Sequence, residues 1–227
     1  MLNLLPPYRT LSVQAIFPPS GSSLDEVTRI LVLASASPAR LRLLQAAGLD
    51  PVVQVSGFDE GSLAETDPAT LVELLAVAKA TAVAAHHANA LVLGCDSLLT
   101  FEGQTFGKAA SPGEVLDRWR RFRGGEGELL TGHCLIDTSR PTGQDRACAV
   151  ARSIIRFGTP DDTELAAYAA TDEALGVAGP FTIDGRAAAF VDSIDGNAGN
   201  VIGVSLPLVR ELLARLDVRL TDLWATS

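Results

Sequence analysis

Short apolar runs alternate with helical patterns in the first half of the chain. Apolar or β-branched runs flanked by turn residues predict buried strands, at residues 30–34, 51–56 and 90–95. Segments that begin with proline predict the intervening helices, at residues 38–47, 68–87 and 112–122. In the second of these helices an apolar stripe repeats at helical spacing, formed by Leu71, Leu74, Leu75, Ala78 and Ala82.

The pattern changes after residue 127. Two long strands are predicted at residues 129–137 and 147–157, and the turn-rich residues 138–145 join them into an antiparallel hairpin. Two further helices and a glycine-rich region of short strands and turns are expected, at residues 161–169, 206–216 and 176–203. Strand–helix alternation followed by a hairpin predicts an α/β fold with a mixed sheet.

Composition excludes several classes of protein. At 227 residues and 47% hydrophobic composition, the chain can bury a substantial core as one large domain or two small ones. Its 18 basic and 27 acidic residues give a net charge of −9, which argues against binding a long nucleic-acid backbone. No apolar run reaches the roughly 18–20 residues of a membrane span. Three cysteines do not make a disulfide framework, so a cytoplasmic location is expected.

The first 29 residues differ in composition from the rest of the chain. They contain four prolines and a Gly-Ser-Ser stretch, and they lack the long apolar region of a signal peptide. We expect residues 1–29 to form a flexible N-terminal extension that carries no chemistry. Residues 30–227 are then expected to form the functional domain.

The helix expected at residues 38–47 begins with unusual charges. Ser37 is a good N-cap and Pro38 a good first residue, but the first two turns carry Arg40 and Arg42 and no acidic residue. Because this end of a helix is already positive, each cation there costs about 0.3–1 kcal/mol. An anion held by N–H groups, serine hydroxyls and guanidinium groups would compensate the charge. Two solvated arginines on a surface helix are the alternative.

Acidic residues follow two of the predicted strands. Asp96 comes at the end of the buried run 90–95, and open α/β sheets place their sites at the carboxyl ends of strands. Of the adjacent Asp59 and Glu60, only one can point inward from an extended segment, and we expect this to be Glu60. Glu60 and Asp96 can together hold magnesium or manganese, and Asp96 can act as a general base toward water. The alternative for Asp96 is a turn-capping role.

Two lysines complete the candidate site. Lys79 lies in an alanine- and leucine-rich helix with no acid within one turn, and Lys108 follows a predicted strand. Together with Arg40 they suit a triphosphate, whose charge needs several cations. Solvated lysines are the alternative. Zinc-ligand spacing, a dinucleotide-binding glycine motif, a phosphate loop and a nucleophile elbow are not found in the sequence.

An ordered set of short motifs extends over residues 30–216. The first are Leu33-Ala-Ser-x-Ser-Pro-x-Arg40, Phe58-Asp-Glu60, Ala78-Lys-Ala80, Gly94-x-Asp-Ser97 and Gly107-Lys108. Later ones include Thr131-Gly132, Thr171-Asp-Glu173, Ala178-Gly179, Ile183-Asp-Gly185 and Asn200-Val-Ile-Gly-Val-Ser-Leu-Pro207. In this order the motifs resemble those of the Maf-like nucleotide pyrophosphatases.

The resemblance implies both a reaction and a fold. The reaction is metal-dependent hydrolysis of a nucleoside triphosphate between the α- and β-phosphates, giving a nucleoside monophosphate and pyrophosphate and removing non-standard or excess nucleotides. The fold is an elongated mixed sheet flanked by helices, with two lobes around a central cleft. Asp96 is then the catalytic base, and Glu60 with Asp96 holds magnesium, manganese or cobalt. The expected substrate-binding residues are Ser35, Ser37, Arg40, Lys79 and Lys108, and a homodimer is compatible with the resemblance.

Three positions depart from the family pattern. Ala39 stands where the family usually has the first of two consecutive arginines, and Val177 stands where many members have a lysine. Asp184 lies near the position of a glutamine in some members, so a preference for uridine, thymidine or 7-methylguanosine triphosphate is not transferred. Because two cations are missing, a nucleotide-binding regulator of septum formation with little or no turnover is the alternative function. A phosphohydrolase that releases orthophosphate is a third.

Overall fold

The computed structural model describes residues 29–63, 65, 67–143 and 145–225, so residues 1–28 of the expected extension lie outside the described residues. Over the described ranges, seven strands form one mixed sheet in the order β2-β1-β3-β5-β6-β7, with β4 paired to β3. β1 is parallel to β2 and β3, and the other pairs are antiparallel. The strands are β1 Ile30–Leu33, β2 Val52–Val53, β3 Ala90–Phe101, β4 Gln104–Phe106, β5 Glu126–Asp137, β6 Arg146–Phe157 and β7 Val191–Gly196.

Five α-helices begin at, or one residue from, the positions that the sequence predicts. The short helix at residues 198–202 lies in the region where only short strands and turns are expected. The α-helices are α1 Pro38–Ala46, α2 Pro68–Ala84, α3 Pro112–Phe122, α4 Asp162–Ala169, α5 Ala198–Ile202 and α6 Leu206–Arg215. The first three start at the predicted prolines, and each is capped by the preceding side chain, from Ser37, Asp67 and Ser111. None of the helices in the described ranges is long and apolar enough to cross a membrane.

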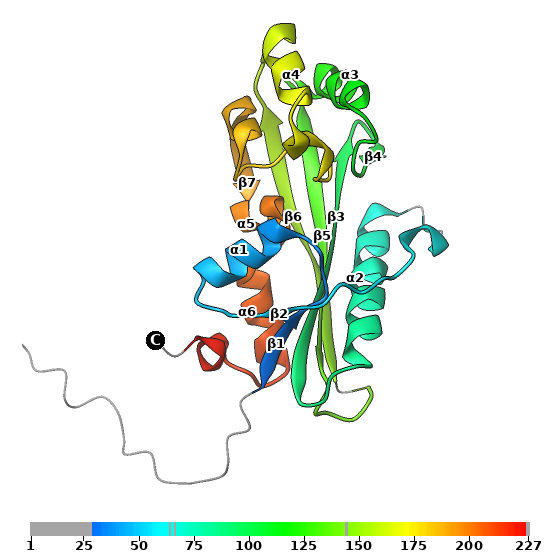
Figure 1. The fold of residues 1–227 in the computed structure, drawn as a ribbon, viewed down its shortest axis with the longest axis vertical. Helices are drawn as coiled ribbons and strands as arrows, with labels where there is room; N and C mark the ends of the chain where they lie inside the picture. The colour runs from blue at the N-terminus through cyan, green and yellow to red at the C-terminus, as the bar shows by residue number, and fades with distance from the viewer. Residues whose placement is uncertain (1–28, 64, 66, 144, 226–227) are drawn as a thin grey trace, which may run out of the picture.

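The long strands β3, β5 and β6 run through two lobes (Figure 1). In the lower lobe of Figure 1, α2 covers one face of the sheet, and α1 and α6 cover the other. Successive side chains of β3 point to opposite faces of the sheet. Val92 packs beneath α2, whereas Leu91 and Leu93 pack beneath α6. The upper lobe has its own core around Trp119 and Phe122 of α3. This arrangement confirms the predicted α/β fold with an elongated mixed sheet.

Two glycines let α2 lie directly against the sheet. A Cβ atom on Gly132 of β5 would come 2.0 Å from the carbonyl oxygen of Val72, and one on Gly94 of β3 would come 2.3 Å from that of Ala76. Both distances are shorter than any van der Waals contact, so only glycine allows this approach. The close packing brings the side chains of α2 onto β3 next to Asp96.

The predicted end of the third strand is wrong. β3 continues through Asp96 to Phe101, because antiparallel pairing with β5 extends over its whole length. What ends near this point is the pairing of β3 with β1, whose last paired residues are Leu33 and Leu93. The site therefore forms where β1 leaves the edge of β3, not where β3 stops. The strand expected at residues 51–56 is also shorter, and only β2 remains of it, at the sheet edge.

Candidate active site

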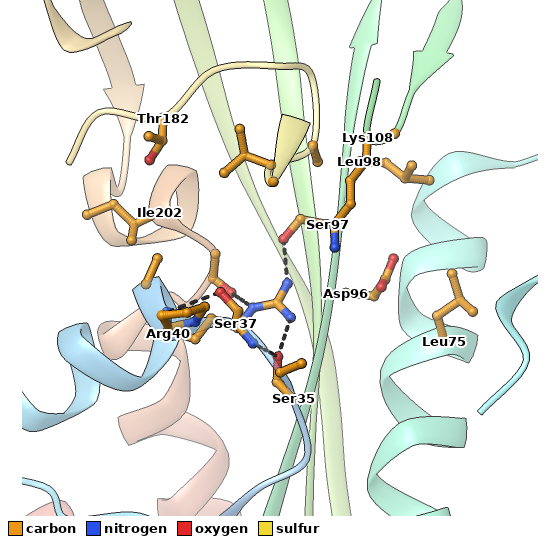
Figure 2. A pocket seen from close by; sticks show the side chains of 18 of the residues that line it. Ser35, Ser37, Arg40, Leu75, Asp96, Ser97, Leu98, Lys108, Thr182 and Ile202 are labelled. Atoms are coloured by element: carbon orange, nitrogen blue, oxygen red, sulfur yellow. Dashed lines mark hydrogen bonds between the residues drawn. The ribbon is translucent and has the colours of Figure 1, made fainter. Parts of the chain in front are cut away.

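A cleft of about 890 Å³ lies between the two lobes. Its walls come from the start of α1, the middle of β3, the side of α2 and the segment at residues 176–185 (Figure 2). All the residues predicted for the site line this cleft: Ser35, Ser37, Arg40, Glu60, Lys79, Asp96 and Lys108. The fold thus brings together residues that are more than 70 positions apart in the sequence.

The ammonium group of Lys79 forms ion pairs with two carboxylates, those of Asp96 and Glu60. Its Nζ atom lies 2.5 Å from Oδ1 of Asp96 and 2.6 Å from Oε1 of Glu60. Lys79 is 9% exposed and Asp96 is 8% exposed, whereas the Glu60 side chain is 57% exposed. The solvated-lysine alternative for Lys79 and the turn-capping alternative for Asp96 are therefore wrong.

Burial dominates the electrostatics of Asp96. Removal from water raises the pKa of its carboxyl group, Lys79 and Arg40 lower it, and Glu60 raises it again. The net result is a pKa above the ordinary value for aspartate. A carboxylate with a raised pKa takes up a proton more readily than an exposed one, which suits a general base.

Glu60 reaches the cleft from a short turn. Residues Glu60–Ser62 form the 3₁₀ turn η1, so the alternation of side chains in an extended segment does not apply here. The Asp59 carboxylate caps that turn by accepting from the N–H of Gly61 at 3.1 Å. As expected, Glu60 rather than Asp59 points toward the cleft, where it pairs with Lys79. The exposed Asp59 side chain bonds the backbone of its own turn instead.

Arg40 donates hydrogen bonds to four acceptors on three segments around the cleft (Figure 2). Its Nε atom donates to the carbonyl oxygen of Gly203 at 2.8 Å. Nη1 donates to Ser35 Oγ and to the Cys95 carbonyl, which is free because β1 has left β3 at that point. Nη2 donates to Ser97 Oγ at 3.0 Å. These four acceptors are neutral, so Arg40 brings positive charge to the start of α1 without a directly bonded carboxylate. Most of its N–H donors are already in use.

The two serines before α1 order its first turn. Ser35 Oγ accepts from the N–H of Ser37 at 3.2 Å, and Ser37 Oγ accepts from the N–H of Arg40 at 3.4 Å. The helix has no acidic residue in its first turn, as the sequence indicated. The start of α1 therefore presents partial positive charge to the cleft, together with the charge of Arg40.

Lys108 faces these groups from the other side of the cleft. It follows β4, is exposed, and forms a β-bridge with Ala178. In Figure 2 its side chain points into the cleft, toward Ser97 and Asp96. Unlike Lys79, it has no acidic partner among the described residues. Its charge is available to an anion in the cleft.

Sequence reasoning missed a chain of polar side chains behind Arg40. Ser97 Oγ lies 2.9 Å from Thr131 Oγ1, which in turn donates to the carbonyl oxygen of Asn200 at 3.2 Å. Thr131 and Asn200 are fully buried. Ser97 and Thr131 both occur in motifs quoted above, but no local pattern showed that they pair. The direct register of Ser97 with Thr131 across β3 and β5 is what joins them.

His133 and the cysteines stay outside the cleft. His133 is buried, and its Nε2 accepts from the N–H of Ser205 at 2.8 Å while Nδ1 donates to the Thr131 carbonyl. Within the ranges that the structure describes, no group of three histidine, cysteine or acidic side chains could hold a metal ion.

Comparison with known proteins agrees with this arrangement. A family model described as Maf-like protein matches residues 30–216, which is most of the chain. The chain belongs to this Maf-like family. The match begins at the first strand of the sheet and ends at the last residues of α6, so it spans both lobes and the cleft.

Several curated relatives of this Maf-like chain share one name. Proteins named nucleoside triphosphate pyrophosphatase from Streptomyces avermitilis and Streptomyces coelicolor are each 54% identical to it, over 88% of this chain and 97% and 96% of their own lengths. One of the same name from Synechocystis is 50% identical over 85% of this chain and 97% of its own length. Ala39, Val177 and Asp184, where this chain departs from the expected Maf-like pattern, all line the cleft.

Proposed function

We propose that this protein hydrolyses nucleoside triphosphates between the α- and β-phosphates, releasing a nucleoside monophosphate and pyrophosphate. The observation that carries the proposal is the position of Asp96, a buried carboxylate with a raised pKa that faces a cleft lined by cations. The names of relatives at about half identity support the same reaction.

Each residue predicted for the site has a role in this proposal. Asp96 accepts the proton of the attacking water, and Lys79 holds Asp96 and Glu60 in place. The first turn of α1, ordered by Ser35 and Ser37, supplies N–H groups and partial positive charge to the phosphates. Arg40 and Lys108 add full charges from opposite walls, which stabilise the charge that develops during phosphoryl transfer.

The carboxylates fit a divalent cation. Glu60 and Asp96 converge on one nitrogen, and the exposure of Glu60 leaves room for water and phosphate ligands. These two residues would hold magnesium, manganese or cobalt, which would supply positive charge for the phosphate oxygens. Hard carboxylate oxygen donors suit such ions.

Measurement of phosphate products tests the reaction. Standard and modified nucleoside triphosphates are incubated with each of the three metals, and pyrophosphate and orthophosphate are measured separately. Pyrophosphate from the wild type and a loss of about 10²–10⁴-fold in Asp96→Asn are expected. Asp195→Asn, which changes an exposed aspartate on β7, is the matched control.

Other outcomes identify the alternatives. Orthophosphate as the first product indicates attack at the terminal phosphate. Nucleotide binding with no release of either product indicates a regulator. The substrate with the highest kcat/KM gives the base preference, which the resemblance leaves open.

We also place the activity in residues 30–227. The family match begins at residue 30, and the described residues of the cleft lie between Ala34 and Gly203. A chain that lacks residues 1–28 is expected to keep the kcat and KM of the full chain. Loss of activity on truncation would assign a role to the extension. The cytoplasmic location and a homodimer stay predictions.

A further inference from the structure

An ion pair joins the two lobes beside the cleft, away from the catalytic carboxylates. Nη2 of Arg42, on α1, lies 2.9 Å from Oδ2 of Asp184, in the segment that follows Phe181. Both residues line the cleft. In sequence they are 142 residues apart, so it is the tertiary structure that brings them together.

Each partner is fixed to its own lobe. Arg42 lies between Leu41 and Leu43, which pack on the core of the lower lobe. Asp184 follows Ile183, which packs on the core of the upper lobe around Trp119. The Oγ1 atom of Thr182 donates to the other carboxylate oxygen of Asp184 at 2.5 Å. The pair therefore connects two separate hydrophobic cores across the cleft, outside the sheet.

Charge keeps the pair formed. Partial burial raises the pKa of Asp184, but the hydrogen bonds from Thr182 and Arg42 outweigh this, so the pKa lies below its ordinary value and the carboxylate is ionised. The Arg42 side chain is 64% exposed and that of Asp184 is 24% exposed. A pair this exposed contributes little to global stability, so its consequence is local, in the relative position of the two segments that it joins.

We propose that the Arg42–Asp184 bridge positions the start of α1 against the upper wall of the cleft, making both side chains positioning residues for the hydrolysis proposed above. Arg42 lies on the same short helix as Arg40, which Ser37 caps. Asp184 belongs to the wall that continues to Val177 and Ala178 beside Lys108. The bridge thus sets the separation between the cations of the two walls, both of which must reach one triphosphate.

Charge reversal tests this proposal. The variants are Arg42→Asp, Asp184→Arg and the double swap, measured for kcat, KM and amide hydrogen–deuterium exchange without nucleotide. Arg152 and Glu128 supply the matched control: they form a 3.2 Å pair of similar exposure, and they do not line the cleft. Their single and double reversals are expected to leave kcat/KM unchanged.

The expected result is a pattern across the variants. Each single reversal lowers kcat/KM roughly tenfold, mainly through KM, because like charges then face each other across the cleft. Exchange in residues 176–190 and in α1 becomes faster in the same variants. The double swap restores both slow exchange and most of kcat/KM, since the bridge forms again with its charges exchanged.

Two results overturn the proposal. If the double swap restores slow exchange but not kcat/KM, Arg42 contacts the substrate directly and is not a positioning residue. If no variant changes exchange, the pair does not hold the lobes. Because exchange is measured without nucleotide, it reports on the bridge even if the wild type releases no pyrophosphate, which separates failure of this inference from failure of the proposed function.

Discussion

Lys79 and Asp96 form a short ion pair, 2.5 Å between Nζ and Oδ1, beneath the open edge of β3. The pair joins the middle of α2 to the middle of β3, and both side chains are almost completely buried. A buried charge without its partner is far less stable than a buried pair. Lys79 therefore contributes to the stability of the fold as well as to the candidate active site.

Lys79→Met removes the ammonium group and leaves Asp96 buried. We expect the free energy of unfolding to fall by about 3 kcal/mol, as measured by urea denaturation. Lys79→Met combined with Asp96→Asn should be more stable than Lys79→Met alone, since no uncompensated charge remains. Lys108→Met, which changes an exposed lysine in the same cleft, is the control and should leave stability unchanged. A double variant no more stable than Lys79→Met contradicts this explanation.

Gly132→Ala tests the close packing of α2 on the sheet. The added Cβ atom meets the Val72 carbonyl oxygen, so α2 must move away from β5 and carry Lys79 from Asp96. We expect a loss of about 3 kcal/mol in urea denaturation, with reduced activity. Gly113→Ala, at the exposed start of α3 with nothing nearer than 3.8 Å, should be neutral or slightly stabilising. Equal stability of the two variants would falsify the packing argument.

Arg40→Lys keeps the charge but loses the planar group that reaches four acceptors. Because lysine has a single nitrogen, the hydrogen bonds to Ser35, Ser97 and the two carbonyl groups cannot all be kept. We expect the free energy of unfolding to fall by about 2 kcal/mol and KM to rise. Arg210→Lys on the exposed side of α6 is the control. A rise in KM with no change in stability means that Arg40 acts only on substrate.

The lowered pKa of the buried His133 makes the free energy of unfolding depend on pH. Burial lowers its pKa to about 4 from an ordinary value of 6.5, with the Thr131 carbonyl opposing this change. Between these values the unfolded chain binds a proton that the folded chain does not, so stability falls as pH decreases from 6.5 to 4. The loss amounts to about 3 kcal/mol over that range.

Urea denaturation at several pH values measures this slope. His133→Asn should flatten it, whatever the variant does to stability at neutral pH, because the titrating group is gone. His86→Asn, which changes an exposed histidine, should leave the slope unchanged. A wild-type slope that survives in His133→Asn assigns the pH dependence to other groups.

Local sequence patterns predict the helix starts, the long hairpin and the candidate site residues of this protein. Proline after a capping residue marks a helix start through short-range hydrogen bonds, so α1, α2 and α3 begin where predicted. The hairpin of β5 and β6 also follows from local patterns, since each long apolar run borders a turn-rich segment. The seven candidate residues followed from charge arguments and ordered motifs, and all of them line the cleft.

Only the tertiary structure determines which of those residues form hydrogen bonds and ion pairs with one another, and which are buried. No local rule says that β3 continues past Asp96 through its pairing with β5. Nor does one say that β1 leaves β3 after Leu93, which frees the Cys95 carbonyl for Arg40. The burial of Lys79 depends on α2 packing against β3 and β5. The bridge between Arg42 and Asp184 depends on two lobes that close around one cleft. Sequence patterns report the preferences of neighbouring residues, whereas ion pairs, burial and pKa values depend on distances across the fold.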